Sequence, residues 1–192
     1  MRAALLKVAQ ERFAEQQRSA GEAALVAPIS PSPPGLVEAT LECLWKRGTL
    51  AKTEGAASPG AAPVRLLDLG CGDARWLTAA CGTYACVGVG YDVDDALLAK
   101  GRAAIARLGL GAVATVERRD FLEPGLDLFR DGDVVVAYLF RDGVARLAAK
   151  LEAELTRGVV VCIGFELRGW RPACELAVHG IKARVYDVGG AS

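Results

Sequence analysis

Short apolar runs alternate with longer helical patterns between residues 64 and 165, and this alternation constrains the fold more than any other feature. Strands separated by helices of this length form right-handed βαβ crossovers, which build a parallel sheet with helices on both faces. The expected strands are residues 64–69, 86–91, 112–118, 133–139 and 159–165, and the expected helices are residues 75–80, 94–108 and 144–155. We therefore predict a doubly wound α/β fold.

The alternation stops after the fifth expected strand. Residues 175–178 and 183–188 flank a His179-Gly180 turn. Two short apolar runs around such a turn are typical of a β-hairpin. We expect an antiparallel pair that closes the edge of the sheet.

Residues 1–63 precede the alternation and predict an N-terminal extension of helices, an arm and a loop. Helical spacing is found in residues 1–20 and 36–45, while residues 27–35 contain four prolines and cannot be the interior of a helix. Residues 48–63 are small, polar and rich in glycine, as in a surface loop. Because 192 residues suit one domain, we expect this extension and residues 64–192 to form a single compact unit.

Charge and composition exclude several classes of protein. The 23 Lys and Arg residues balance 23 Asp and Glu residues, so the chain as a whole has no electrostatic attraction to nucleic acid. Its longest apolar runs, residues 134–140 and 159–165, fall far short of the roughly 20 residues of a membrane-spanning helix. The six cysteines contain no C-x-x-C pair and His179 is the single histidine, so we expect no metal site.

The cysteine pattern also predicts free thiols in a reducing, intracellular compartment, and we expect a cytoplasmic protein. The opening residues include Arg2 and Lys7, as a mitochondrial presequence would, whereas Glu11 and Glu15 argue against import. Mitochondrial location is the alternative.

The most informative motif is LLDLGCGDARWL, residues 66–77, in which an expected strand runs through Gly70 and Gly72 into an expected helix. Glycines at this junction let the backbone turn sharply and let a ligand approach the start of the helix. Asp92 follows Gly72 by 20 residues, at the end of the next expected strand, where a carboxylate can accept hydrogen bonds from ribose hydroxyls. This arrangement suits a dinucleotide or an adenosyl sulfonium cofactor.

Two residues favour the sulfonium. Arg75 occupies the position at which a dinucleotide-binding motif has its third glycine, and its bulk would obstruct the pyrophosphate. Asp68 places negative charge near the site, which repels a pyrophosphate and attracts an ammonium or sulfonium group. A NAD-dependent oxidoreductase is therefore the less favoured alternative.

With these motifs the chain resembles the class I, seven-stranded S-adenosylmethionine-dependent methyltransferases, and the resemblance makes residues 64–192 the methyltransferase domain. The first motif of that family corresponds to Asp68 through Ala74, with Gly70, Cys71 and Gly72 inside it. Asp92 in VGVGYD matches the ribose-binding acid of the family. Asp120 and Phe121 in RRDFLE match the pair that contacts adenine.

The chain also resembles a narrower group, the small protein-lysine methyltransferases related to those that act on ATP synthase subunit c and the adenine nucleotide translocase. The resemblance rests on PISPSPPGLVEATL, DLGCGDAR, GYDVDDALL and GVVVCIGFELRGWRP. In that group a Pro-Thr-Pro segment helps to enclose the cofactor. The corresponding residues here are Pro31, Ser32 and Pro33, which makes Ser32 a candidate cofactor contact.

The acceptor side carries fewer signals. Methyltransferases of bases or glutamine typically have an Asn/Asp-Pro-Pro-aromatic motif after the fourth strand, and this chain has AYLF there, which argues against those acceptors. Tyr138 lies at the end of that strand, where it would line a lysine channel or orient the amine as the candidate catalytic residue. Phe165 and Trp170 are candidates for the same pocket, with cation-π contacts to a methylated amine as one role and core packing as the other.

These observations predict an N-methyltransferase that uses S-adenosylmethionine to modify a lysine side chain of a protein. Methyl transfer from a sulfonium requires alignment and exclusion of water more than acid–base catalysis. A small molecule or RNA as acceptor, and a non-catalytic methyltransferase-like binding module, are the alternatives.

Overall fold

A computed structural model describes residues 31–53, 62–123 and 133–189. The described strands are β1 (Val64–Leu69), β2 (Cys86–Asp92), β3 (Ala114–Arg118), β4 (Val134–Ala137), β5 (Gly158–Ile163), β6 (Cys174–Val178) and β7 (Ile181–Val188). The described helices are α2 (Pro34–Lys46), α3 (Arg75–Thr83), α4 (Asp95–Arg107) and α5 (Arg141–Glu154). The helix expected in residues 1–20, the start of the proline-rich arm and most of the 48–63 loop lie outside the described residues.

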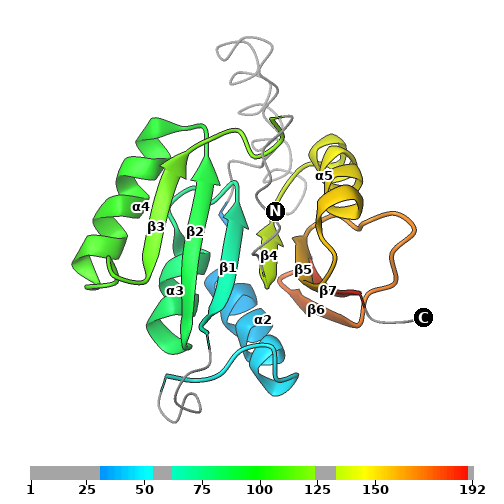
Figure 1. The fold of residues 1–192 in the computed structure, drawn as a ribbon, viewed down its shortest axis with the longest axis horizontal. Helices are drawn as coiled ribbons and strands as arrows, with labels where there is room; N and C mark the ends of the chain where they lie inside the picture. The colour runs from blue at the N-terminus through cyan, green and yellow to red at the C-terminus, as the bar shows by residue number, and fades with distance from the viewer. Residues whose placement is uncertain (1–30, 54–61, 124–132, 190–192) are drawn as a thin grey trace.

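The seven strands form one sheet in the order β3-β2-β1-β4-β5-β7-β6 (Figure 1). The pairings that join β3, β2, β1, β4 and β5 are all parallel, and β7 is antiparallel to both β5 and β6. The strands β1 to β4 therefore end at the same edge of the sheet, where their arrowheads meet in Figure 1. The prediction of a mostly parallel α/β sheet with a C-terminal antiparallel hairpin is confirmed.

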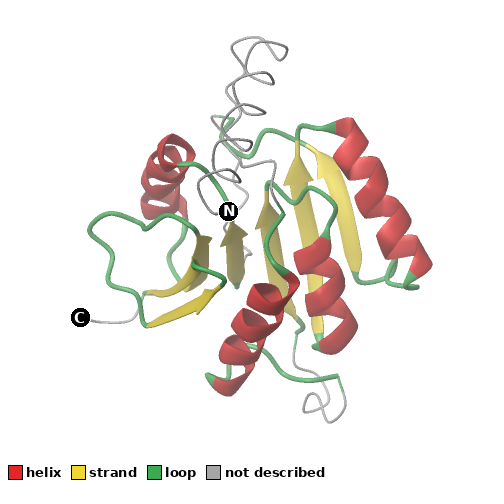
Figure 2. Cartoon of the chain, turned by 180° about the vertical axis from the view of Figure 1, so that it is seen from behind, coloured by secondary structure: helices red, strands yellow, loops and turns green. Residues whose placement is uncertain are grey.

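Helices cover both faces of the sheet, as predicted. Alternate residues of each strand face opposite ways, so Val134 and Val136 join one apolar cluster while Val135 and Ala137 join the other. The first cluster contains the buried residues of α2, α3 and α4, and the second contains those of α5. Figures 1 and 2 show α5 on one side of the sheet and α2 and α3 on the other.

Several element boundaries differ from the expected ones for local reasons. β3 begins at Ala114 instead of residue 112, because the backbone N–H groups of Val113 and Ala114 both donate to the carbonyl of Leu110 in a turn. β5 ends at Ile163 instead of residue 165, because Gly164 adopts φ 81° and leaves the extended conformation. These shifts shorten the elements without changing their order.

The C-terminal hairpin turns at His179 and Gly180, as expected. Both residues have left-handed backbones, with φ 51° and 79°. Two consecutive positive φ values are what a two-residue type I′ turn requires. The hairpin joins the sheet through its second strand, since β7 pairs with β5 and leaves β6 at the edge.

Helix α2 belongs to the core of the domain, although it ends at Lys46 and the first strand begins only at Val64. Its residues Leu36, Val37, Leu41 and Leu44 are buried in the same cluster as α3 and β1. Pro34 occupies the first turn, where its missing N–H has no intrahelical partner to lose. The predicted helix at 36–45 is therefore an integral part of the packing.

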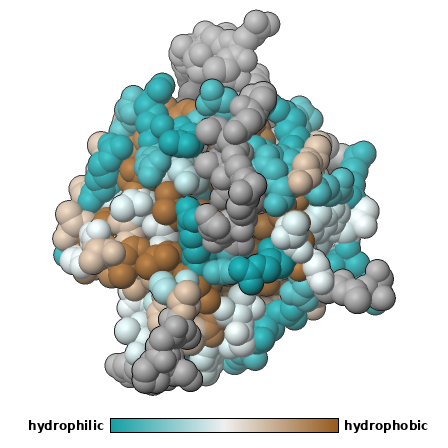
Figure 3. Space-filling model, in the orientation of Figure 1, coloured by the Kyte–Doolittle hydropathy of each residue, from teal (hydrophilic) through white to brown (hydrophobic). Residues whose placement is uncertain are grey.

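The surface of the molecule is mainly polar on the face seen in Figure 1. Figure 3 shows hydrophilic side chains over much of one face, with apolar ones in smaller areas between them. None of the described helices is both long and apolar enough to cross a membrane.

Two glycines of β2 allow α3 to lie close to the sheet. A Cβ added at Gly90 would come within 2.6 Å of the Cys71 Cβ and 2.9 Å of Leu77, and one at Gly88 would come within 2.6 Å of Leu77. At such distances the Cys71 side chain in the glycine turn and the Leu77 side chain of α3 would have to shift. The glycines in CVGVGYD thus set the separation between β2 and the helix that follows the glycine turn.

We predict that Gly90→Ala lowers the free energy of unfolding by about 1–3 kcal/mol through overpacking. Gly111→Ala is the matched control, because a Cβ there meets nothing within 4 Å, and its effect should stay within about 0.5 kcal/mol. Urea unfolding of both variants measures the difference, and equal stabilities would contradict this account of α3 packing.

Candidate functional site

The turn after β1 has an unusual backbone. Gly70, Gly72 and Ala74 all adopt left-handed conformations, with φ 75°, 51° and 61°. The N–H groups of Gly70 and Cys71 both donate to the carbonyl of Tyr91, at 2.8 and 3.1 Å. The turn therefore folds back against the end of β2, and a side chain at either glycine would be strained.

Asp92 connects this turn to the start of α4. Its Oδ2 accepts a hydrogen bond from the Gly72 N–H at 2.8 Å, and its Oδ1 accepts one from the Asp94 N–H at 3.0 Å. Asp94, not Asp92, caps α4 through the N–H groups of Ala96 and Leu97. Asp92 is half-buried, and its carboxylate oxygens retain lone pairs for further donors such as ribose hydroxyls.

Asp68 is the most unusual charged residue of the site. It is 2% exposed, and its Oδ2 atom is buried without a hydrogen-bond partner among the described residues. Burial, reinforced by the nearby carboxylates of Asp92 and Asp73, raises the pKa of this carboxyl from 3.8 to about 8. A buried acceptor without a partner is costly, so this atom is suited to a cationic donor from a ligand.

The third acid of the turn, Asp73, is already neutralised. The Arg75 guanidinium donates to both carboxylate oxygens of Asp73, at 2.9 and 2.6 Å, and lowers the pKa of that carboxyl. Arg75 also donates to the carbonyl of Ser32 at 2.7 Å. Arg75, which replaces the third glycine of a dinucleotide-binding motif, thus connects the glycine turn to the proline-rich arm.

Ser32 lies against α3. Its hydroxyl accepts a hydrogen bond from Trp76 Nε1 at 3.1 Å, and the residue is 3% exposed. The arm therefore lies beside the glycine turn, but the described contacts of Ser32 are with Arg75 and Trp76. The Pro31-Ser32-Pro33 segment predicted a cofactor contact for Ser32, and nothing in it indicated the hydrogen bond with Trp76.

Of the remaining three cofactor candidates, Asp120 and Phe121 follow β3. Asp120 is exposed, and its Oδ1 accepts the N–H of Leu122 at 2.9 Å, which forms a turn. Phe121 is 4% exposed and packs in the α5-side cluster. Cys71 is buried within the glycine turn, and burial raises the pKa of its thiol.

The acceptor candidates Tyr138 and Phe165 lie at the ends of the neighbouring strands β4 and β5. Tyr138 is half-buried and burial raises the pKa of its hydroxyl. Its ring lies against Gly164, where an added Cβ would be 3.3 Å from the Tyr138 Cε2. Phe165 follows Gly164 directly, so the two aromatic side chains come from adjacent segments at one edge of the sheet.

A cavity of about 460 Å³ opens between α5 and the segment after β5. Its described lining is Asp142, Val144, Ala145, Ala148, Gly164, Phe165, Glu166, Arg168 and Arg184. Two carboxylates and two guanidinium groups therefore share this space with one aromatic ring. Sequence reasoning missed Asp142, Arg168 and Arg184, because α5 and β7 reach the cavity only through the folding of the sheet.

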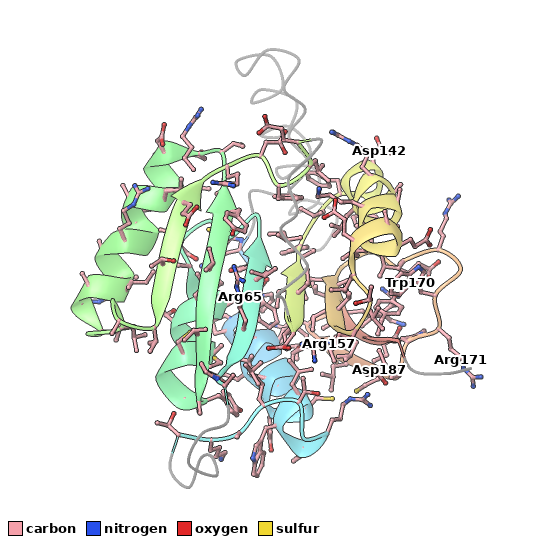
Figure 4. All side chains as sticks on the ribbon, in the orientation of Figure 1. Arg65, Asp142, Arg157, Trp170, Arg171 and Asp187 are labelled. Carbon is pink, nitrogen blue, oxygen red and sulfur yellow. The ribbon has the colours of Figure 1, made fainter. Side chains whose placement is uncertain are left out.

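Trp170 is not among the described residues that line the cavity. Its Nε1 donates to Glu152 at 3.1 Å, and its ring meets Tyr186 edge to face with centroids 6.1 Å apart. Figure 4 shows Asp142 at one end of α5 and Trp170 toward the other. The structure therefore brings Phe165 to the cavity and gives Trp170 packing contacts elsewhere.

Within the described part of the chain, no group of three or more His, Cys, Asp and Glu residues is arranged to hold a metal ion. The site consists of a backbone turn, carboxylates and aromatic rings.

A parallel sheet with β7 inserted beside β5, and a glycine turn tied to an acid at the end of β2, define the Rossmann-like class of methyltransferase folds. The RNA methyltransferase from Salinibacter ruber, solved with S-adenosyl-L-homocysteine, is similar with TM-score 0.71 and 23% identity, covering 85% of this chain and 96% of that one. The human methyltransferase 10 domain containing protein has TM-score 0.59 and 13% identity, with 95% and 97% covered. At these identities the likeness shows the fold alone.

The chain belongs to the family of the ANTKMT methyltransferase domain, whose family model matches residues 68–174. It is also 32% identical over 131 residues to the adenine nucleotide translocase lysine N-methyltransferase of Mus musculus. That alignment covers 67% of this chain and 55% of the mouse protein, so the chain corresponds to about half the length of its relative. The resemblance seen in the sequence is thereby confirmed.

We predict that the free energy of unfolding falls as pH rises from about 4 to about 8, by up to about 1.4 kcal/mol per unit, because of Asp68. Its pKa is higher in the folded than in the unfolded chain, so its stabilising effect is complete below pH 4 and is lost as pH rises through 8. Asp68→Asn should remove this part of the pH dependence.

Urea unfolding of the wild type and of Asp68→Asn between pH 5 and 8.5 gives the difference between their free energies of unfolding. The other titrating groups are common to both proteins and cancel in this difference. Parallel stability curves would contradict the raised pKa of Asp68.

Proposed function

We propose that the chain is an S-adenosylmethionine-dependent N-methyltransferase that modifies a lysine side chain of a protein. The observation that carries the cofactor assignment is the buried Oδ2 of Asp68, which has no hydrogen-bond partner among the described residues. Asp68 is near the end of β1, two residues before Gly70. The family membership supports the reaction class, and the neighbour solved with S-adenosyl-L-homocysteine has the same fold.

The residues of the turn fit this cofactor. Asp68 can accept the α-ammonium group of a methionine moiety, which would give the orphaned oxygen a charged donor. At Gly72 an added Cβ would approach only Leu97, at 4.0 Å, so the space above the turn is open to a ligand. Asp92 is held by two backbone N–H groups in a position to accept from ribose hydroxyls.

The charge balance of the turn supports a cationic ligand over a pyrophosphate. Arg75 is engaged by Asp73 and by the Ser32 carbonyl, which leaves Asp68 and Asp92 without a described cationic partner. The Asp92 carboxylate repels phosphate groups and attracts an ammonium or a sulfonium, and a cationic donor at Asp68 would favour the ionised form of that buried carboxyl. A nicotinamide dinucleotide is correspondingly disfavoured.

The chemistry of methyl transfer asks little of the protein beyond alignment. S-adenosylmethionine, when bound, supplies an electrophilic methyl group on a positively charged sulfur. Phe165 lines the cavity and packs on the α5 side of the sheet, whereas Tyr138 packs on the α2 and α3 side and is not among the described residues that line the cavity. Apolar surface such as the Phe165 ring excludes water from an acceptor. An amine in such surroundings loses its proton more readily, as a lysine acceptor must.

The lysine assignment rests on the mouse relative and on the chemistry of the cavity. The mouse protein is named for lysine methylation of the adenine nucleotide translocase. The Phe165 ring offers a cation-π contact to a methylated amine, while the carboxylates of Asp142 and Glu166 share the cavity with the guanidinium groups of Arg168 and Arg184. An RNA acceptor is separated from this proposal by the experiment below.

We predict that Asp92→Ala weakens binding of S-adenosylmethionine by about 1–3 kcal/mol, roughly 5- to 150-fold in Kd. The control is Asp95→Ala, which removes an exposed carboxylate in the first turn of α4 that pairs with Arg118 at 3.2 Å. Isothermal titration with S-adenosylmethionine and, separately, NADH measures both variants. An unchanged Kd in Asp92→Ala, or tight binding of NADH, would exclude the assignment.

We further predict transfer of methyl groups to lysine. Mouse adenine nucleotide translocase in detergent, incubated with the full chain and methyl-deuterated cofactor, should gain labelled methyl groups on lysine in tandem mass spectra. The same substrate with acetylated lysines should gain none, because its amines are blocked. Labelling of total RNA in place of protein would support the RNA alternative, and cofactor binding without any product would support the binding module.

A further inference from the structure

Two cysteines far apart in the sequence meet where α2 crosses the C-terminal hairpin. Cys43 lies on α2 and Cys174 begins β6, and their sulfur atoms are 3.0 Å apart. Both side chains are partly exposed, and both are free thiols in this structure. A disulfide has an S–S length of about 2.0 Å, so closure requires the sulfur atoms to approach by only about 1 Å.

The contact is fixed by the packing on both sides of Cys43. Toward the start of α2, a Cβ added at Gly35 would lie 3.7 Å from Val178 at the end of β6. Toward the end of the helix, the Arg47 guanidinium donates to both carboxylate oxygens of Asp187 on β7, each at 2.7 Å. Contacts on either side of the pair hold α2 in register with the hairpin, which keeps the backbones of Cys43 and Cys174 side by side.

We propose that Cys43 and Cys174 form a reversible disulfide that fastens α2 to the C-terminal hairpin. This modification site is separate from the glycine turn and from the cavity beside α5, and it does not depend on the proposed methyl transfer.

Glutathione disulfide is the oxidant class that balances the reaction. One cysteine thiolate attacks glutathione disulfide, forms a mixed disulfide and releases one glutathione thiolate, which takes up the proton. The second cysteine then attacks the protein sulfur of the mixed disulfide and expels the second glutathione. Two cysteine thiols are oxidised to one disulfide, and one glutathione disulfide is reduced to two glutathione thiols.

The surroundings of Cys43 bear on the order of attack. Burial, together with the hydrogen bond and charge of Cys174, raises the pKa of the Cys43 thiol to about 11. This disfavours Cys43 as the first nucleophile and leaves the first attack to Cys174. Once Cys174 is in the mixed disulfide, its contribution to the pKa of Cys43 is removed, which favours the second step.

The chain offers an internal control in Cys81 and Cys86. These two sulfur atoms are 3.7 Å apart, but the residues are only 8% and 4% exposed and lie in the core cluster, Cys81 on α3 and Cys86 at the start of β2. Glutathione disulfide cannot reach them in the folded protein. Proximity and access occur together at the Cys43–Cys174 pair and not at Cys81–Cys86.

The test uses the full chain equilibrated with mixtures of reduced and oxidised glutathione, followed by alkylation and peptide mapping. The wild-type protein should lose two of its six thiols and give one cross-linked peptide that contains Cys43 and Cys174. Cys81→Ser should behave in the same way. Cys43→Ser should give no internal cross-link and instead carry one glutathione on Cys174.

Thermal unfolding is a second readout. The bridge joins residues 131 positions apart, and a cross-link over so long a loop should raise Tm by about 5–10 °C in the oxidised wild type. Cys43→Ser and Cys174→Ser should show no such rise in oxidising mixtures. Six free thiols in the wild type at every glutathione ratio, or a cross-link between other cysteines, would overturn the proposal.

Discussion

The hydrogen bond from the Gly72 N–H to the Asp92 carboxylate links the two halves of the candidate site. It ties the turn after β1 to the end of β2, and the second oxygen of Asp92 ties the same carboxylate to the start of α4. The turn can reach Asp92 only because Gly70 and Gly72 adopt positive φ, and Gly101 on α4 packs against Ala74, where an added Cβ would be 3.1 Å from the Ala74 Cβ. The positions of two helices and two strands thus follow from one backbone constraint.

The same constraint concentrates negative charge. Asp68, Asp73 and Asp92 surround one turn, and the fold balances them in different ways. Arg75 pairs with Asp73, backbone N–H groups hold Asp92, and Asp68 is buried with an oxygen that no described residue satisfies. A stable interior normally avoids such a group, and its presence at a strand end next to a glycine turn is typical of a binding site, where a ligand completes the structure.

Local signals in the sequence were sufficient for the order of strands and helices. The alternation of apolar runs predicted β1 to β5 with α3 to α5, helical spacing predicted α2, and the His179-Gly180 turn predicted the hairpin of β6 and β7. The glycine motif and Asp92 were predicted to belong to one cofactor site, and the structure places the Gly72 N–H 2.8 Å from the Asp92 carboxylate. These successes share a cause, because each depends on residues close in sequence or on the fixed geometry of βαβ units.

The contacts that sequence reasoning missed join segments that no local pattern relates. Ser32 and Trp76 are 44 positions apart and Cys43 and Cys174 are 131 apart. Each contact requires α2 to be placed against a particular part of the fold. Helical spacing in α2 predicts which face of the helix is buried, but it does not predict which elements that face contacts. Trp170 shows the same limit, since an aromatic residue after β5 can face a cavity or pack on Tyr186 with the same local sequence.

The position of β7 between β5 and β6 has a consequence for synthesis of the chain. β5 is a run of apolar residues whose outer edge is covered only when Ile181–Val188 pairs with it. Until the ribosome has released those residues, β5 presents an open and apolar strand edge of the kind that promotes association between chains. A chain whose synthesis has passed β5 but not β7 therefore lacks the strand that covers this edge in the folded protein.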